Sequence, residues 1–166
     1  MIADRLRMQR KKRLILYDYG AGENNWTTGA ISGLFTKTYS KEIDHLFLKL
    51  KAGLGTPGYS VVTYVTTSTY DLSNYNTVNC LVNIDSNTSM ISRYYFALIA
   101  STDQNGNSKI YDARITTNTK GDNDLSLDVS SLSGLYYVRI HAVYDHTLGP
   151  YYKDYFAAKT YHIKLA

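Results

Sequence analysis

The fold is decided by residues 125–142, which read LSLDVSSLSGLYYVRIHA. Apolar residues alternate with other residues at both ends of this stretch: Leu125, Leu127 and Val129 at the start, and Val138, Ile140 and Ala142 at the end. A period of two places alternate side chains on one face of a β-strand, so each end predicts a strand with one buried face. Between them, the Asp128 carboxylate and the serine hydroxyls that follow are expected to cap backbone N–H groups in a tight turn.

The same alternation recurs along the chain. It comprises Leu46, Leu48 and Leu50; Val78, Cys80, Val82 and Ile84; Tyr94, Phe96, Leu98 and Ala100; and Tyr161, Ile163 and Leu165. Turn-forming residues cluster between these runs, and Asn105-Gly106 predicts a hairpin that joins strands near 91–101 and 107–116, because both central positions of a type I′ turn need a positive φ. Counting such runs gives about nine or ten short strands, which suits two packed sheets.

These features predict an all-β fold, an antiparallel two-sheet β-sandwich of the jelly-roll type spanning residues 14–166. The composition agrees, since 17 tyrosines occur in 166 residues beside many threonines, and these residue types favour a half-buried pleated surface. Residues 1–13 form a separate basic arm with a net charge of +5, against +4 for the whole chain, so the sandwich itself is nearly neutral. The arm is predicted to form at most a short helix that needs a partner to order it.

Secretion and membrane signals are not expected. The apolar run Leu14–Tyr17 has four residues before Asp18, which is too short for the core of a secretory signal. No apolar stretch approaches the roughly 18 residues of a membrane span, so no membrane insertion is expected. Cys80 is the single cysteine, which excludes an internal disulfide and a cysteine-based zinc cluster.

Several motifs resemble a known group of proteins. They are residues 16–20 (LYDYG) with Trp26, residues 45–48 (HLFL), residues 71–75 (DLSNY) and residues 127–138 (LDVSSLSGLYYV). Together they resemble β-sandwich domains in structural proteins of tailed bacteriophages, which are related in shape to carbohydrate-binding modules. The resemblance covers nearly all of the chain after the arm, although the phage domains are often appended to a longer tail or fibre chain.

The resemblance implies a non-enzymatic virion component, in the tail, baseplate, fibre or head decoration, assembled in the host cytoplasm. Its partners would be other virion proteins and further copies of itself, with cell-surface carbohydrate as a ligand. A free carbohydrate-binding module is the alternative, and an enzyme that acts on glycans is the third hypothesis.

Aromatic residues are the candidates for glycan binding, because sugars stack on the face of Trp or Tyr rings. Trp26 with Asn24 and Asn25 forms one polar aromatic segment, and Tyr151-Tyr152 forms a second. The alternative for Trp26 is a structural role in closing one end of the sandwich. The tyrosine pair would serve equally well at a contact with a neighbouring subunit.

The arm has three interpretations: a solvated terminus, a nucleic-acid contact, or a helix that docks on a partner protein. The candidate docking residues are Ile2, Arg5, Leu6, Arg10, Lys11 and Lys12. Nucleic acid is the less favoured partner, because the arm has no aromatic residue to stack on bases and its apolar residues would have no role against phosphate.

No motif predicts catalysis, a cofactor or a metal site. His45 and His162 are expected to face outward from strands, and His141 forms a loose group with Asp145 and His146 that lacks a further ligand. A glycosidase would need two carboxylates that flank one bond. However, Asp18, Asp71, Asp103 and Asp128 occupy turn positions, where backbone capping already explains them. The loop at 122–124 is better explained as a turn than as a calcium site.

Overall fold

The computed structural model describes residues 13–18, 25–33, 35–51, 58–87, 92–105, 110–116, 119–146 and 155–166. Several of the predicted functional positions lie outside these ranges. They are the docking residues Ile2, Arg5, Leu6, Arg10, Lys11 and Lys12 of the arm, and Asn24, Tyr151 and Tyr152 of the predicted glycan platform. These assignments remain predictions.

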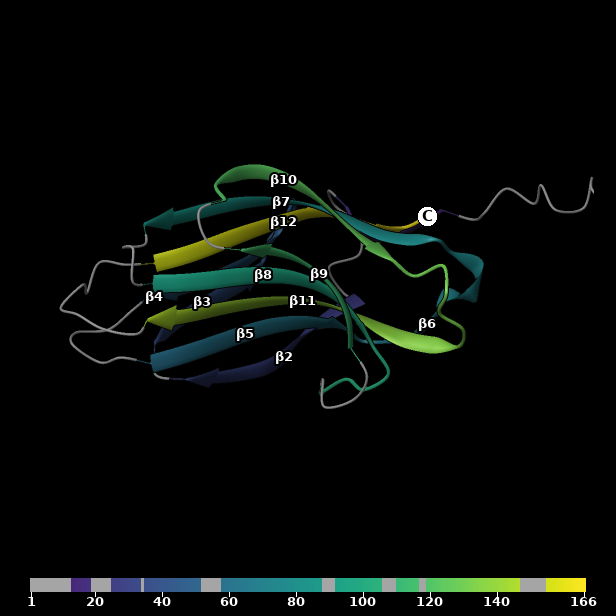
Figure 1. The fold of residues 1–166 in the computed structure, drawn as a ribbon, viewed down its shortest axis with the longest axis horizontal. Coiled ribbons are helices and arrows are strands. Elements are labelled where there is room, and N and C mark those ends of the chain that lie inside the picture. Colours follow the sequence, from purple (N-terminus) through teal and green to yellow (C-terminus); the bar gives the residue numbers. More distant parts are fainter. Residues whose placement is uncertain are drawn as a thin grey trace, which may run out of the picture.

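Two antiparallel sheets form the molecule (Figure 1). One sheet, named here the β12 sheet, has the order β10 (Gly121–Asp128), β7 (Thr77–Asn87), β12 (Tyr155–Leu165), β4 (Leu46–Lys51), β3 (Thr36–Lys41), with β1 (Leu14–Tyr17) also paired to β12. The other, the β11 sheet, has the order β2 (Trp26–Gly33), β5 (Gly58–Thr66), β11 (Leu135–His146), β8 (Ser92–Ser101), β9 (Ile110–Thr116), with β6 (Tyr70–Asp71) also paired to β11. The predicted all-β sandwich is therefore confirmed. The described residues contain no α-helix, and so none that could span a membrane.

The core lies between the sheets and is built from the predicted alternation. Leu46, Leu48 and Leu50 of β4 are fully buried, as are Val82 of β7 and Ile140 of β11. Opposite them, the β11 sheet contributes inward-facing residues of its own strands; those in the core cluster include Val62, Tyr64, Phe96, Leu98 and Ala142. The burial of one face of every long strand is what holds the two sheets together.

The predicted capping of a tight turn by an aspartate side chain is present twice. Asp71 Oδ1 accepts a hydrogen bond from the Ser73 backbone N–H at 3.1 Å, at the start of a 3-10 turn over Leu72–Asn74. Asp128 Oδ1 accepts one from the Ser130 N–H at 2.9 Å. Hydrogen bonds from the paired serine lower the pKa of both carboxyls, because each bond favours the ionised form. Both aspartates are thus structural caps.

Two features differ from the prediction. Trp26 begins strand β2 instead of lying in a loop, and it is buried. Strand β12 contains a register shift between Thr160 and Ile163, where two of its residues oppose Leu81 alone. Such a bulge changes which residues share a face. Consequently Tyr161, which the pattern placed beside Ile163 and Leu165 on the buried face, is half-buried and contacts His45 with ring centroids 5.6 Å apart.

Candidate ligand-binding face

The outer face of the β11 sheet is unusually well buried for a surface that points away from the core. Its side chains with at most 5% exposure are Val61, Thr63, Val65, Ala97, Ile99, Ser101, Arg139 and Val143. The apolar members of this set do not belong to the core cluster, although they are buried. The strand register places longer side chains beside the small ones: His141 and Arg114 both flank Ala97. We call this surface the β11 face.

The outer face of the β12 sheet is more polar, although Phe47, Leu81 and Ala157 also lie on this side. Asp122, Asp124, Ser126 and Asp128 all point outward from β10 and are exposed. Asn83 of β7 donates a hydrogen bond from Nδ2 to Asp122 Oδ1 at 2.6 Å. The outer face of the β11 sheet is therefore the more apolar of the two. An outer face lined by apolar side chains is a candidate for a surface with a binding function.

Three side chains stand together on the β11 face. The Tyr95 ring stacks on the His141 ring, with centroids 5.9 Å apart and planes at 28°. Arg114 lies over the same Tyr95 ring, with its guanidinium carbon 4.9 Å from the centroid. Arg114 Nε also pairs with Asp112. Stacking and ion pairing hold these groups in fixed positions, so the face presents an ordered set of hydrogen-bonding groups.

His141 is the electrostatically unusual member of this cluster. Its Nδ1 is 2.9 Å from Thr63 Oγ1 on the neighbouring strand β5. Burial, together with the nearby positive charges of Arg139 and Arg114, lowers the pKa of His141 to about 4. His141 is therefore neutral at physiological pH, and one of its ring nitrogens is an acceptor or donor suited to a hydroxyl group.

We expect this His141 pKa to make folding stability depend on pH. Between about pH 6.5 and 4 the unfolded chain binds a proton at position 141 that the folded protein excludes, so the stabilisation is complete above pH 6.5 and declines as the pH falls to 4. The loss is on the order of 3 kcal/mol. Thermal melts of the parent and of His141→Gln across this range measure it. The variant should show a flatter curve, and parallel curves would contradict the low pKa.

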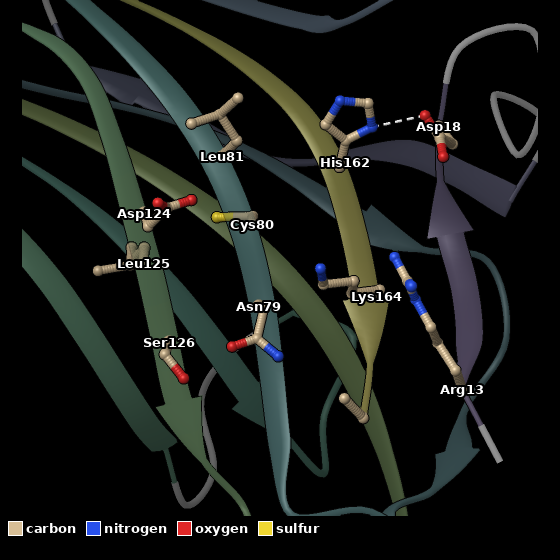
Figure 2. Close-up of a pocket in the computed structure, with 11 residues that line it drawn as sticks. Arg13, Asp18, Asn79, Cys80, Leu81, Asp124, Leu125, Ser126, His162 and Lys164 are labelled. Carbon is tan, nitrogen blue, oxygen red and sulfur yellow. Dashed lines mark hydrogen bonds and ion pairs between the residues drawn. The ribbon is translucent and has the colours of Figure 1, made fainter.

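A second candidate site is a hollow of about 640 Å³ on the β12 sheet (Figure 2). Arg13 and Lys164 line one side of it, Asp124 projects from β10 on the other, and Cys80 lies between. His162 Nδ1 is 2.5 Å from Asp18 Oδ1, and both side chains are part of the rim. Positive and negative groups mix here, and burial raises the pKa of the Cys80 thiol to about 12. A thiol with so high a pKa is a poor nucleophile.

The sequence-predicted glycan platform is not brought together at Trp26. The Trp26 ring is 1% exposed, and its Nε1 donates a hydrogen bond to the Leu16 carbonyl at 3.1 Å. Asn25 is exposed next to it, and its carbonyl accepts a hydrogen bond from the Thr67 N–H. A buried ring offers no face to a sugar, so burial favours the structural alternative for Trp26.

No metal site is found in the described ranges. They contain no group of three or more histidine, cysteine, aspartate or glutamate side chains suited to a metal ion. His162 is exposed, as expected from the sequence, whereas the side chain of His45 is only 15% exposed and its Nδ1 lies 2.6 Å from Asp44 Oδ1. The expectation of a protein without cofactor or metal stays a prediction.

Sequence reasoning missed the β11 face, although a signal existed. It assigned Tyr94, Phe96, Leu98 and Ala100 to a buried face, but the intervening residues of the same strand, 95, 97 and 99, are also apolar or aromatic. When a strand is apolar on both faces, each face is expected to be buried in the protein or to bind another molecule. His141, which the sequence analysis grouped with Asp145 and His146, lies in the middle of β11.

Comparison with known proteins gives a fold and no family. No protein-family model and no curated protein matches the chain. One similar solved structure is the family 11 carbohydrate-binding module from Clostridium thermocellum, in complex with a β-1,3-1,4-mixed-linked tetrasaccharide. Its TM-score is 0.52 at 17% sequence identity, and the match covers 92% of this chain and 94% of that chain. TmCBM27, a module studied for specific mannan recognition, also scores 0.52 at 12% identity, with 93% and 99% covered. A point mutant of the family 29 module CBM29-2 scores 0.52 at 8% identity, with 93% and 91% covered. The chain thus has a β-sandwich fold like that of carbohydrate-binding modules.

Proposed function

We propose that this protein is a non-catalytic domain that binds glycan on the β11 face. The observation that carries the proposal is the contrast between the two outer faces, one more polar and the other more apolar, with an ordered cluster of Tyr95, His141 and Arg114. The fold shared with carbohydrate-binding modules supports the same conclusion. The free binding module, which was the alternative from the sequence, is thereby the better-supported hypothesis.

The chemistry of the face suits a sugar. A saccharide has apolar C–H surfaces and many hydroxyl groups, so its binding site needs apolar contact together with a few fixed donors and acceptors. The half-buried Tyr95 ring supplies apolar contact, while the exposed Arg114 and the neutral His141 supply polar groups. The cluster is already ordered by its own stacking, which reduces the entropy lost on binding.

Several acidic residues are occupied elsewhere, which supports binding without hydrolysis. Asp112, the acid closest to the cluster, is paired with Arg114. Asp71 and Asp128 cap turns. A glycosidase needs one carboxyl with a raised pKa as its acid, whereas the pKa values of Asp71 and Asp128 are lowered.

The test is replacement of Tyr95 by alanine. We expect Tyr95→Ala to weaken glycan affinity about tenfold or more, because it removes a ring that orders both His141 and Arg114. Glycan-array screening followed by calorimetry on the best ligand measures the change. Tyr161→Ala, which removes a half-buried tyrosine on the opposite sheet, is the matched control and should bind like the parent. The reverse pattern would place the glycan on the β12 sheet.

We also propose, from the resemblance and the charge of the arm, that residues 1–13 attach this domain to a larger assembly such as a virion. The sandwich is nearly neutral and needs no basic arm to fold, so deletion of residues 1–12 should change the melting temperature by only about a degree or two. Incorporation into particles, or co-purification with the partner, should be lost. Normal incorporation of the shortened chain would show that the sandwich surface makes the attachment.

A further inference from the structure

Arg139 is the residue of the β11 face that the structure leaves incomplete. It lies on the outer side of β11, where the register places it between Val65 of β5 and Ile99 of β8. Both neighbours are apolar and buried, and Arg139 itself is only 3% exposed. A guanidinium is thus held in the floor of the face between two hydrocarbon side chains.

Part of the hydrogen-bonding capacity of this guanidinium is unused. Its buried Nε has no hydrogen-bond partner, and no ion pair to Arg139 is found among the described residues. A guanidinium carries five N–H donors, and buried donors in folded proteins are nearly always paired. A buried cation with an unpaired N–H donor is costly, so an Nε that stays unpaired points to a ligand.

Neighbouring acids compensate the charge of Arg139 only in part, because burial lowers its pKa by more than the charge of Asp103 raises it. Asp112 is committed to Arg114, and Asp103 acts on Arg139 only through its charge, without a hydrogen bond between them. Asp145 lies six residues further along β11, which is about 20 Å at the rise of a strand. Since His141 is uncharged at neutral pH, Arg139 is a positive charge of this face that no ion pair among the described residues compensates.

We propose that Arg139 binds an anionic oxygen group of the glycan, so that the ligand of the β11 face is an acidic polysaccharide carrying carboxylate or sulfate groups. The inference rests on the proposed glycan-binding function and deepens it. A hydroxyl would satisfy an N–H donor but leave the charge uncompensated, whereas a carboxylate or sulfate does both and matches the planar fork of a guanidinium. Arg139 points to the outer side of the sheet, because its chain neighbour Ile140 points into the core, so a ligand on the β11 face approaches the guanidinium from that side.

The experiment compares polysaccharides that share a backbone and differ in charge. The pairs are polygalacturonate with its methyl ester, carboxymethyl cellulose with hydroxyethyl cellulose, and dextran sulfate with dextran. We expect the parent to bind at least one charged member about tenfold to a hundredfold more tightly than its neutral counterpart, the range for hydrogen bonds to charged groups. The first two pairs report on carboxylate and the third on sulfate.

Two variants assign any preference to Arg139. Arg139→Gln should abolish the preference for the charged member, whereas Lys159→Gln, which removes an exposed cation from the opposite sheet, should keep it. Melting curves verify that both variants fold. If Arg139→Gln disturbs the structure of the β11 face, Arg139→Lys is measured in its place, and Arg139→Lys should retain part of the preference for the charged member. Equal binding of charged and neutral members, or a preference that survives Arg139→Gln, would overturn the inference alone. Failure of the parent to bind any polysaccharide of the panel or of a glycan array would overturn the proposed function with it.

Discussion

Ile140→Asp is expected to leave the chain unfolded. Ile140 is fully buried in the centre of β11, with Tyr64 and Leu98 as its partners on the adjacent strands. A carboxylate there would be buried without a partner, at a cost of about 3–5 kcal/mol besides the lost apolar contacts. Since domains are stable by only about 5–15 kcal/mol in total, this loss removes most or all of the stability.

Circular dichroism and the dispersion of the proton NMR spectrum measure the loss of the fold. Val82→Asp tests the β12 sheet in the same way, because Val82 is fully buried in β7. Leu135→Asp is the matched control: it places the same charge on the same strand at a residue that is 61% exposed, and it should melt close to the parent. Parent-like melting of Ile140→Asp would show that the face assigned to the core is wrong.

Trp26→Ala is expected to lower stability by about 3–5 kcal/mol, the usual cost of truncating a large buried side chain. The ring is 1% exposed and its N–H is bonded to Leu16, so the variant loses packing and a hydrogen bond that links β2 to β1. For a domain of this size the melting temperature should fall by about 10 °C. Differential scanning calorimetry measures the change.

The control for Trp26 is phenylalanine, which keeps one aromatic ring in the core but loses the N–H donor and the second ring of the indole. Trp26→Phe should therefore cost less than Trp26→Ala, with the lost hydrogen bond contributing on the order of 1 kcal/mol. A small effect of Trp26→Ala on melting, combined with loss of glycan binding, would restore the exposed platform that the sequence suggested for this residue.

Strands with a clean alternation were predictable from the sequence, and the reason is physical. In Leu46, Leu48 and Leu50, or in Val78 to Ile84, one face is buried in the core and the other meets solvent, so hydrophobicity itself encodes the period of two. The pairing of β8 with β9 that the Asn105-Gly106 signal predicted is also present. Local patterns sufficed because the core imposes the same requirement on every strand.

Strand β5 shows why the candidate site was harder to predict. Its sequence contains Val61-Val62 and Tyr64-Val65, so apolar residues fall on both faces and the period of two is hidden. Apolar residues on both faces hide the strand in the sequence, and the same residues give the β11 face its apolar character. Tyr95, His141 and Arg114 lie far apart in the sequence, and only the pairing of β11 with β8 and of β8 with β9 brings them together.

The measurement that tests the central claim most directly is a chemical-shift map of the folded protein during titration with a glycan that it binds. Glycan binding by the β11 face predicts that the largest shifts fall on the backbone amides of Ala97, Ile99, Arg139 and His141, from neighbouring strands. The hollow on the other sheet provides an internal control, because Asn79, Ser126 and Lys164 should move little. Largest shifts at those three residues, with an unmoved β11 face, would contradict the claim.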